Sequence, residues 1–163
     1  MKTIGLLLVA LVVVLWLGTC SRGPERRLIG TWRMDFEATK AEIEKKLAEE
    51  TEEGSAAQAF GRAFLAAAGM QEREMTFSRD GTVRSVIRGN PERIPWPGGG
   101  AVLHEEEGRW QAEQVDDDVL KVKITGGERE FADWRAEIHF EDNDRFYYYT
   151  GGEMKVREYW FRR

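Results

Sequence analysis

This chain of 163 residues contains few cysteines and histidines, the residues that disulfides and many metal sites require. It has a single cysteine, Cys20, so no internal pair is available for a disulfide. The fold must therefore be stabilised by its core, for which six tryptophans, four tyrosines and eight phenylalanines supply the material. Only two histidines are present, His104 beside a loop and His139 on the outer phase of an expected strand. We expect neither a metal nor another cofactor.

The charge balance excludes further classes of partner. Acidic side chains number 29 against 24 basic ones, a net charge of −5. Nucleic-acid binding needs a basic surface that neutralises phosphates, so we expect no nucleic-acid partner. Adsorption to anionic lipid head groups is disfavoured for the same reason. No serine stands in a nucleophile elbow and no acids are paired at a catalytic spacing, so the chain is not expected to be an enzyme.

The longest uncharged run lies at the amino terminus. Lys2 is followed by uncharged residues from Thr3 to Ser21, and the run contains Leu17-Gly18-Thr19-Cys20. A basic start, an apolar stretch and small residues at the end are typical of a secretory signal peptide.

This segment resembles the signal of a bacterial lipoprotein, in which leucine stands three residues before the lipidated cysteine. The resemblance implies that residues 1–19 are removed and that Cys20 carries a lipid anchor in a membrane of the cell envelope, facing the extracytoplasmic side. Residues 20–27 would form a short tether. Ser21 is not the aspartate that retains such proteins at the inner membrane, which implies the outer membrane in a Gram-negative cell. The alternatives are an uncleaved transmembrane anchor, since nineteen uncharged residues can span a bilayer, and a secreted protein.

The rest of the chain reads mainly as β-strands. Apolar and polar residues alternate from Leu28 to Phe36, the period of a half-buried strand. After Gln71, short alternating segments are separated by turn residues, and Asp80-Gly81 is the strongest hairpin signal. We expect a kink at 105–108 between two stretches of strand. About eight strands at this spacing predict an all-β sandwich or barrel.

A helical insertion interrupts this pattern after the first strand. Thr39-Lys40-Ala41-Glu42 matches a capping box, which predicts a helix that begins there. The helical spacing continues in two pieces, 40–53 and 55–68, broken at Gly54-Ser55 and ended by Gly69.

Four stretches in order resemble the lipocalin-like lipoproteins of bacterial envelopes. They are Leu28-Ile29-Gly30-Thr31-Trp32, the segment 75–82 around the hairpin, Glu107-Gly108-Arg109-Trp110, and the segment 140–148. The resemblance implies that residues 28–163 form one antiparallel up-and-down barrel of about eight strands, with the insertion 40–68 after the first strand. It also implies that Trp32 lies at the barrel base.

Polar and aromatic residues in the inward phase are the candidates for a ligand site. An eight-stranded barrel holds packed side chains or one small ligand. Trp110 and Trp134 are read as either core or cavity wall, and Gln114 and Glu158 as buried polar groups; a bulge that turns Glu158 outward is the alternative. Ser85 shares this inward reading.

Two functions therefore remain open. The first is an anchored lipoprotein that binds a small apolar or amphipathic ligand inside the barrel, with the helical insertion as a lid. The second is a structural or interaction module with a solid core that binds another envelope protein. For the second, Tyr147-Tyr148-Tyr149 and Phe161 are a candidate partner surface.

Overall fold

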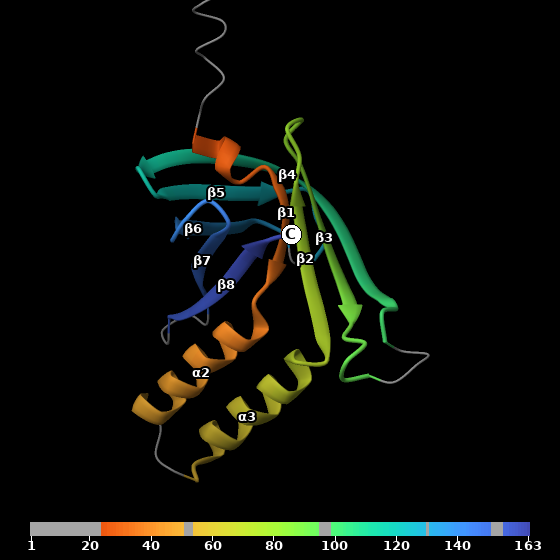
Figure 1. Cartoon of the computed structure of the whole chain (residues 1–163), viewed down its shortest axis with the longest axis vertical. Helices are drawn as coiled ribbons and strands as arrows, with labels where there is room; N and C mark the ends of the chain where they lie inside the picture. Colours follow the sequence, from red (N-terminus) through yellow and green to blue (C-terminus); the bar gives the residue numbers. More distant parts are fainter. Residues whose placement is uncertain (1–23, 51–53, 95–98, 130, 151–154) are drawn as a thin grey trace, which may run out of the picture.

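The computed structural model describes residues 24–50, 54–94, 99–129, 131–150 and 155–163. Eight strands form one closed barrel, in which each strand pairs antiparallel with the next and β8 pairs with β1 (Figure 1). This confirms the predicted up-and-down barrel. The elements in order are η1 (Pro24–Arg27), β1 (Gly30–Met34), α2 (Phe36–Glu50), α3 (Ala56–Ala68), β2 (Gln71–Phe77), β3 (Thr82–Gly89), β4 (Val102–Asp116), β5 (Val119–Thr125), β6 (Trp134–Phe140), β7 (Arg145–Thr150) and β8 (Val156–Arg162).

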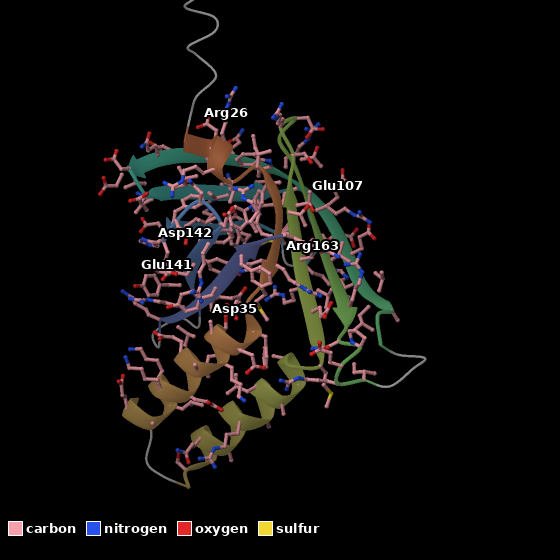
Figure 2. The ribbon with its side chains drawn as sticks, in the orientation of Figure 1. Arg26, Asp35, Glu107, Glu141, Asp142 and Arg163 are labelled. Carbon is pink, nitrogen blue, oxygen red and sulfur yellow. The ribbon has the colours of Figure 1, made fainter. Side chains whose placement is uncertain are left out.

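The alternating sequence pattern sets which side chains enter the barrel. On β5, Leu120, Val122 and Ile124 are buried while Lys121 and Lys123 are exposed. Charged side chains coat the outside in this way, as exposed Glu107 and Arg163 illustrate (Figure 2). The side-chain period of two therefore fixes the register of the whole sheet.

The hairpin predicted at Asp80-Gly81 joins β2 to β3. Gly81 has a φ of +82°, a conformation that glycine adopts without strain. The Asp80 carboxylate accepts a hydrogen bond from the Thr82 backbone N–H at 2.9 Å. Phe77 then pairs with Val83, which places both in the core.

The kink predicted at 105–108 is wrong, because β4 is one strand of 15 residues. Its first part pairs with β3 and its second part with β5, and the register shifts at Ile87/Arg88 and at Gln114/Asp116 instead. Glu106 keeps the inward phase because its carboxylate accepts a hydrogen bond from the Arg129 backbone N–H at 2.8 Å. Because this buried carboxylate has a hydrogen-bond donor, the segment can keep Glu106 inside the barrel without a kink.

The helical insertion has the predicted two pieces but a different beginning. The capping box at Thr39–Glu42 is wrong, since α2 begins at Phe36 and Asp35 accepts a side-chain hydrogen bond from the Ala38 N–H at 3.0 Å. Thr39 is instead buried within the helix, where its hydroxyl accepts from the Tyr159 N–H at 3.0 Å. For α3 the prediction holds: Ser55 caps its start and Gly69 its end. The last three residues of the predicted piece 40–53 lie outside the described residues.

The two helices extend from one end of the barrel, which we call the helical end (Figure 1). The start of α2 is fastened to β8, because the Asp35 N–H donates to the Tyr159 carbonyl at 2.8 Å. In turn α3 packs against α2 where Leu47 meets Gly61; a Cβ at Gly61 would lie 2.5 Å from Leu47 Cδ1, so a larger residue there would require the Leu47 side chain to shift.

Aromatic rings fill the end of the barrel at which β1 begins. Trp32 is 0% exposed, lies edge-on to Phe146 with ring centroids 4.6 Å apart, and donates from its indole Nε1 to the Leu28 carbonyl at 2.7 Å. Residues 24–27, predicted as part of a polar tether, form η1, and Arg27 lies over the Phe140 ring at 4.3 Å. Trp32 therefore occupies the barrel base, as the sequence resemblance implied.

Candidate functional site

The first candidate site is a buried carboxylate inside the helical end. Glu158 on β8 is 8% exposed and lies directly opposite Tyr148 on β7. The β7–β8 register runs without a shift from Arg145 opposite Phe161 to Thr150 opposite Val156. No bulge turns Glu158 outward, so the predicted inward phase is confirmed.

Three side chains, those of Arg73, Tyr148 and Trp160, surround this carboxylate, and together with Glu158 they form what we call the inner polar cluster. The Tyr148 hydroxyl donates to Glu158 Oε1 at 2.5 Å, and Trp160 Nε1 donates to the same oxygen at 3.1 Å. Arg73 reaches both carboxylate oxygens at the longer distances of 3.4 and 3.5 Å. Charge-assisted hydrogen bonds offset the cost of burying the charge.

Sequence reasoning missed Arg73 and Glu106, although the alternation along their strands places both side chains in the inward phase. Arg73 alternates with Met75 and Phe77 on β2, and its side chain enters the barrel with 27% exposure. Glu106 alternates with Gly108 and Trp110 on β4; it is buried and lies 3.4 Å from His104 Nε2. A charged residue in an inward phase was the signal that would have found both.

The tryptophans proposed as cavity wall lie on either side of β5, where Trp110 of β4 and Trp134 of β6 both stand opposite Ile124. Trp134 is half-buried and meets the Tyr148 ring edge-on, with centroids 5.3 Å apart, so it borders the inner polar cluster. Trp110 packs edge-on against Phe77 at 5.5 Å and donates to the Ser78 carbonyl at 3.0 Å. Ser85 is 1% exposed, in agreement with its predicted inward phase.

The prediction that Gln114 is buried is wrong. Gln114 is exposed, and its side-chain amide donates to the Asp116 carbonyl at 3.3 Å. The residue keeps the phase of Trp110 and Ala112, but the β4–β5 register shifts directly after it, between Gln114 and Asp116. Periodicity alone does not locate the point at which a strand leaves the core.

Two depressions on the described part of the protein lie on the outer wall. One, of about 590 Å³, spans β4, β5 and β6 and is flanked by Glu113, Lys121, Lys123, Arg135 and Glu137. A smaller one, of about 260 Å³, lies among Arg33, Glu72, Glu74, Arg88 and Arg163. Neither of them is bounded by Trp110, Trp134 or Glu158.

The second candidate site is a group of rings on the outer face of β6, β7 and β8. We call it the outer aromatic cluster; its members are His139, Tyr147, Tyr149, Arg157 and Tyr159. His139 stacks on Tyr147 with ring centroids 5.0 Å apart and an interplanar angle of 7°. Tyr147 also meets Tyr149 and Tyr159, each at 5.6 Å. Within the triplet Tyr147-Tyr148-Tyr149, the middle ring faces inward and the outer two form this surface.

Arg157 lies in the middle of the outer aromatic cluster. Its guanidinium carbon is 4.8 Å from the Tyr147 ring centroid and 5.9 Å from that of Tyr149, and Nη1 donates to the Tyr159 hydroxyl at 3.4 Å. Hydrogen bonds to the Tyr159 and Tyr149 hydroxyls raise the pKa of Arg157 above its ordinary value. Burial, followed by the neighbouring Tyr149, raises the pKa of Tyr147.

Sequence reasoning named Tyr147-Tyr148-Tyr149 and Phe161 for this surface but not His139, Arg157 or Tyr159. Phe161 is exposed and lies two residues beyond Tyr159 on β8. His139 and Arg157 share the outward phase of their strands, and the β6–β7 register places His139 opposite Tyr147. This pairing depends on the turn at 141–144, which periodicity does not determine.

Further observations bear on anchoring and on metal binding. Cys20 and the segment 1–19 lie outside the described residues. Within the described ranges, no helix is both long and apolar enough to cross a membrane. In the same ranges, no three side chains of histidine, cysteine, aspartate or glutamate converge as metal ligands. Comparisons with known protein families, curated proteins and solved structures find no match to this chain.

Proposed function

We propose that the chain is a small, non-enzymatic envelope lipoprotein whose barrel is an interaction module with a solid core. The outer aromatic cluster is the observation that carries this proposal. The outer face of an antiparallel sheet is normally polar, whereas here three tyrosines, a histidine and an arginine are in mutual contact on it. Tyrosine and arginine are also enriched among the residues that dominate protein–protein binding.

The packing of the interior supports the same proposal. Trp32, Phe140 and Phe146 contact one another, Phe146 stacks on Trp160 at 6.2 Å, and Phe77 meets Trp110. A barrel of eight strands is just wide enough for its side chains to fill it. Binding at the outer wall needs no cavity, so a filled barrel serves as a rigid scaffold for that surface.

Anchoring at Cys20 is the second part of the proposal and is supported by the sequence segment described above. The net charge of −5 gives the barrel no electrostatic attraction to anionic head groups, so a lipid at Cys20 would supply the attachment. The tethered barrel would then present its outer wall to a partner protein of the same envelope.

Site-specific photocrosslinking in the native cell tests the interaction. The full-length chain carries p-benzoylphenylalanine in place of Tyr149, which is 44% exposed, and in a control in place of exposed Arg84 on β3, four strands away around the barrel. We expect one discrete covalent complex with a second protein from position 149 and none from position 84. Absence of a complex at 149, or an equal yield from both positions, contradicts the interaction module.

A second function, binding of a small amphipathic ligand, is favoured by the inner polar cluster. Arg73 enters the barrel with 27% exposure beside Glu158, and half-buried Trp134 borders the same cluster, so an anionic ligand group that enters the helical end would meet a guanidinium and an aromatic ring. Titration of the full-length protein with dodecanoate, followed by tryptophan fluorescence, tests it. A saturable change that Arg73→Gln removes supports the ligand site, and an unchanged spectrum contradicts it.

A further inference from the structure

The outer wall holds two arginines that lie over tyrosine rings but have different charged neighbours. Arg145 on β7 lies over the Tyr159 ring at 5.0 Å, and its guanidinium is 3.3 Å from Asp35 and 3.5 Å from Glu141. Asp35 is labelled where β1 passes into α2, and Glu141 precedes β7 (Figure 2). Arg145 therefore combines aromatic support from one side with carboxylates on another.

Arg157 has the aromatic half of that arrangement. Tyr147, Tyr149 and Tyr159 support its guanidinium, as described above, while no carboxylate of the described residues lies within 4 Å of it. A guanidinium has five N–H donors in a planar fork that matches the two oxygens of a carboxylate. The rings hold this fork in one orientation, so little side-chain entropy remains to be lost when an anion binds.

The surroundings of Arg157 favour a single acid rather than an extended anionic surface. The chain as a whole carries a net charge of −5, which repels a polyanion or a membrane of anionic lipids. The exposed ring of Tyr149 offers apolar area beside the cation. An acidic side chain framed by apolar atoms, as a folded protein presents it, meets both requirements.

We propose that Arg157, held by Tyr147, Tyr149 and Tyr159, binds an aspartate or glutamate side chain of a partner protein. This inference rests on the proposed interaction module and specifies the chemistry of its contact. The bound carboxylate would take the place at Arg157 that Asp35 and Glu141 take at Arg145.

The experiment extends the crosslinking from position 149 of the full-length chain. Arg157→Gln removes the charge, Arg157→Lys keeps it without the planar fork, and Arg145→Gln is the matched control on the same wall. Mass spectrometry identifies the crosslinked peptide of the partner. We expect a peptide that contains Asp or Glu, a loss of yield of about tenfold or more in Arg157→Gln, a smaller loss in Arg157→Lys, and little change in Arg145→Gln.

Charge reversal provides the second arm. Arg157→Glu should abolish the complex, and replacement of the partner's acid by arginine should restore it; this acid is also mutated alone, in case Arg157 variants fold poorly. The inference is overturned if the yield survives Arg157→Gln, if the peptide contains no acid, or if the adduct is a lipid or a second copy of this chain. If a complex forms at position 149 with the same yield in the Arg157 variants, the interaction module stands and the role of Arg157 is refuted. If no complex forms at all, the interaction module and the role of Arg157 are both refuted.

Discussion

Removal of the Trp32 ring is the most direct test of the filled barrel. The indole is fully buried at the base, and the guanidinium of Arg162 lies 4.4 Å from its ring centroid. Phe146 and Phe140 meet it edge-on at centroid distances of 4.6 and 6.3 Å. Trp32→Ala therefore removes the ring that joins β1 to the aromatic residues of β6 and β7.

The expected loss of unfolding free energy combines several contributions. Replacement of a buried Trp or Phe by Ala costs about 3–5 kcal/mol through lost transfer energy and the residual cavity. The Leu28 carbonyl also loses its indole donor, a contribution of about 1 kcal/mol for a typical hydrogen bond. Surrounding rings are held by the closed sheet and collapse poorly into the space, so we expect a value near the upper limit, about 4–5 kcal/mol.

Urea unfolding followed by far-ultraviolet circular dichroism measures this loss. With an m-value of about 2 kcal/mol per molar, the midpoint should fall by about 2 M at unchanged m. Phe161→Ala is the matched control, because Phe161 is 37% exposed and its loss should cost about 1 kcal/mol or less. Equal midpoint shifts in Trp32→Ala and Phe161→Ala would refute the argument that Trp32 fills the base.

Three further predictions concern other parts of the chain. Mass spectrometry of the membrane-extracted protein should show a chain that begins at an acylated Cys20; an intact Met1 or an unmodified Cys20 would rule out the lipid anchor. Hydrogen exchange should show the bonded amides of Asp35, Ala38 and Thr39, where the start of α2 is fastened to β8, protected like the strands, and α3 less protected and insensitive to envelope lipid. Protection of α3 that rises with added lipid would instead favour the ligand-binding function with a helical lid. Burial raises the pKa of Tyr147, so the folded state holds its phenol proton more tightly than the unfolded state does. This stability contribution is complete below the ordinary tyrosine pKa of 10.0 and is lost as pH rises through the folded value. In an absorbance titration near 295 nm, Tyr147→Phe should remove a component above pH 10.0, and loss of a component below it would contradict the assignment.

The fold could be predicted from the sequence because its signals are local. Alternation places Leu120, Val122 and Ile124 inside, and Asp80-Gly81 marks the turn at which the chain reverses. Each strand pairs with the next one along the chain, so adjacent hairpins are enough to specify the order of the sheet.

The errors occur where tertiary contacts override a local signal. Thr39 has the residue type and spacing of a cap, yet its hydroxyl bonds the backbone of Tyr159, 120 positions later. A kink is predicted at 105–108, yet β4 continues through it, and the Arg129 N–H, from the loop after β5, bonds the buried Glu106 carboxylate. Such partners are invisible to an argument from one segment.

The candidate site was only partly predictable for a similar reason. Glu158 was found because its neighbours in phase are apolar. The proposed binding role of Arg157 depends on three tyrosines from two strands, and on the absence of a carboxylate within 4 Å among the described residues. Neither fact is expressed in the spacing of residues along β8.

The pairing of β1 with β8 has a consequence for how this protein folds. From β2 to β8, each strand pairs with the next one along the chain without a helical insertion between them, so these hairpins can form early and nearly independently. Arg162 instead joins the two ends of the sequence: it donates to the carbonyls of Ile29 and Arg27, the latter 135 positions away. Bringing such distant residues together carries the largest loop-closure entropy in the sheet. We therefore expect a rapid zipping of β2 through β8 into a curved, open sheet, followed by a slower step in which β1 completes the ring. Until that step occurs, the inner faces of both edge strands stay accessible to water and to other chains.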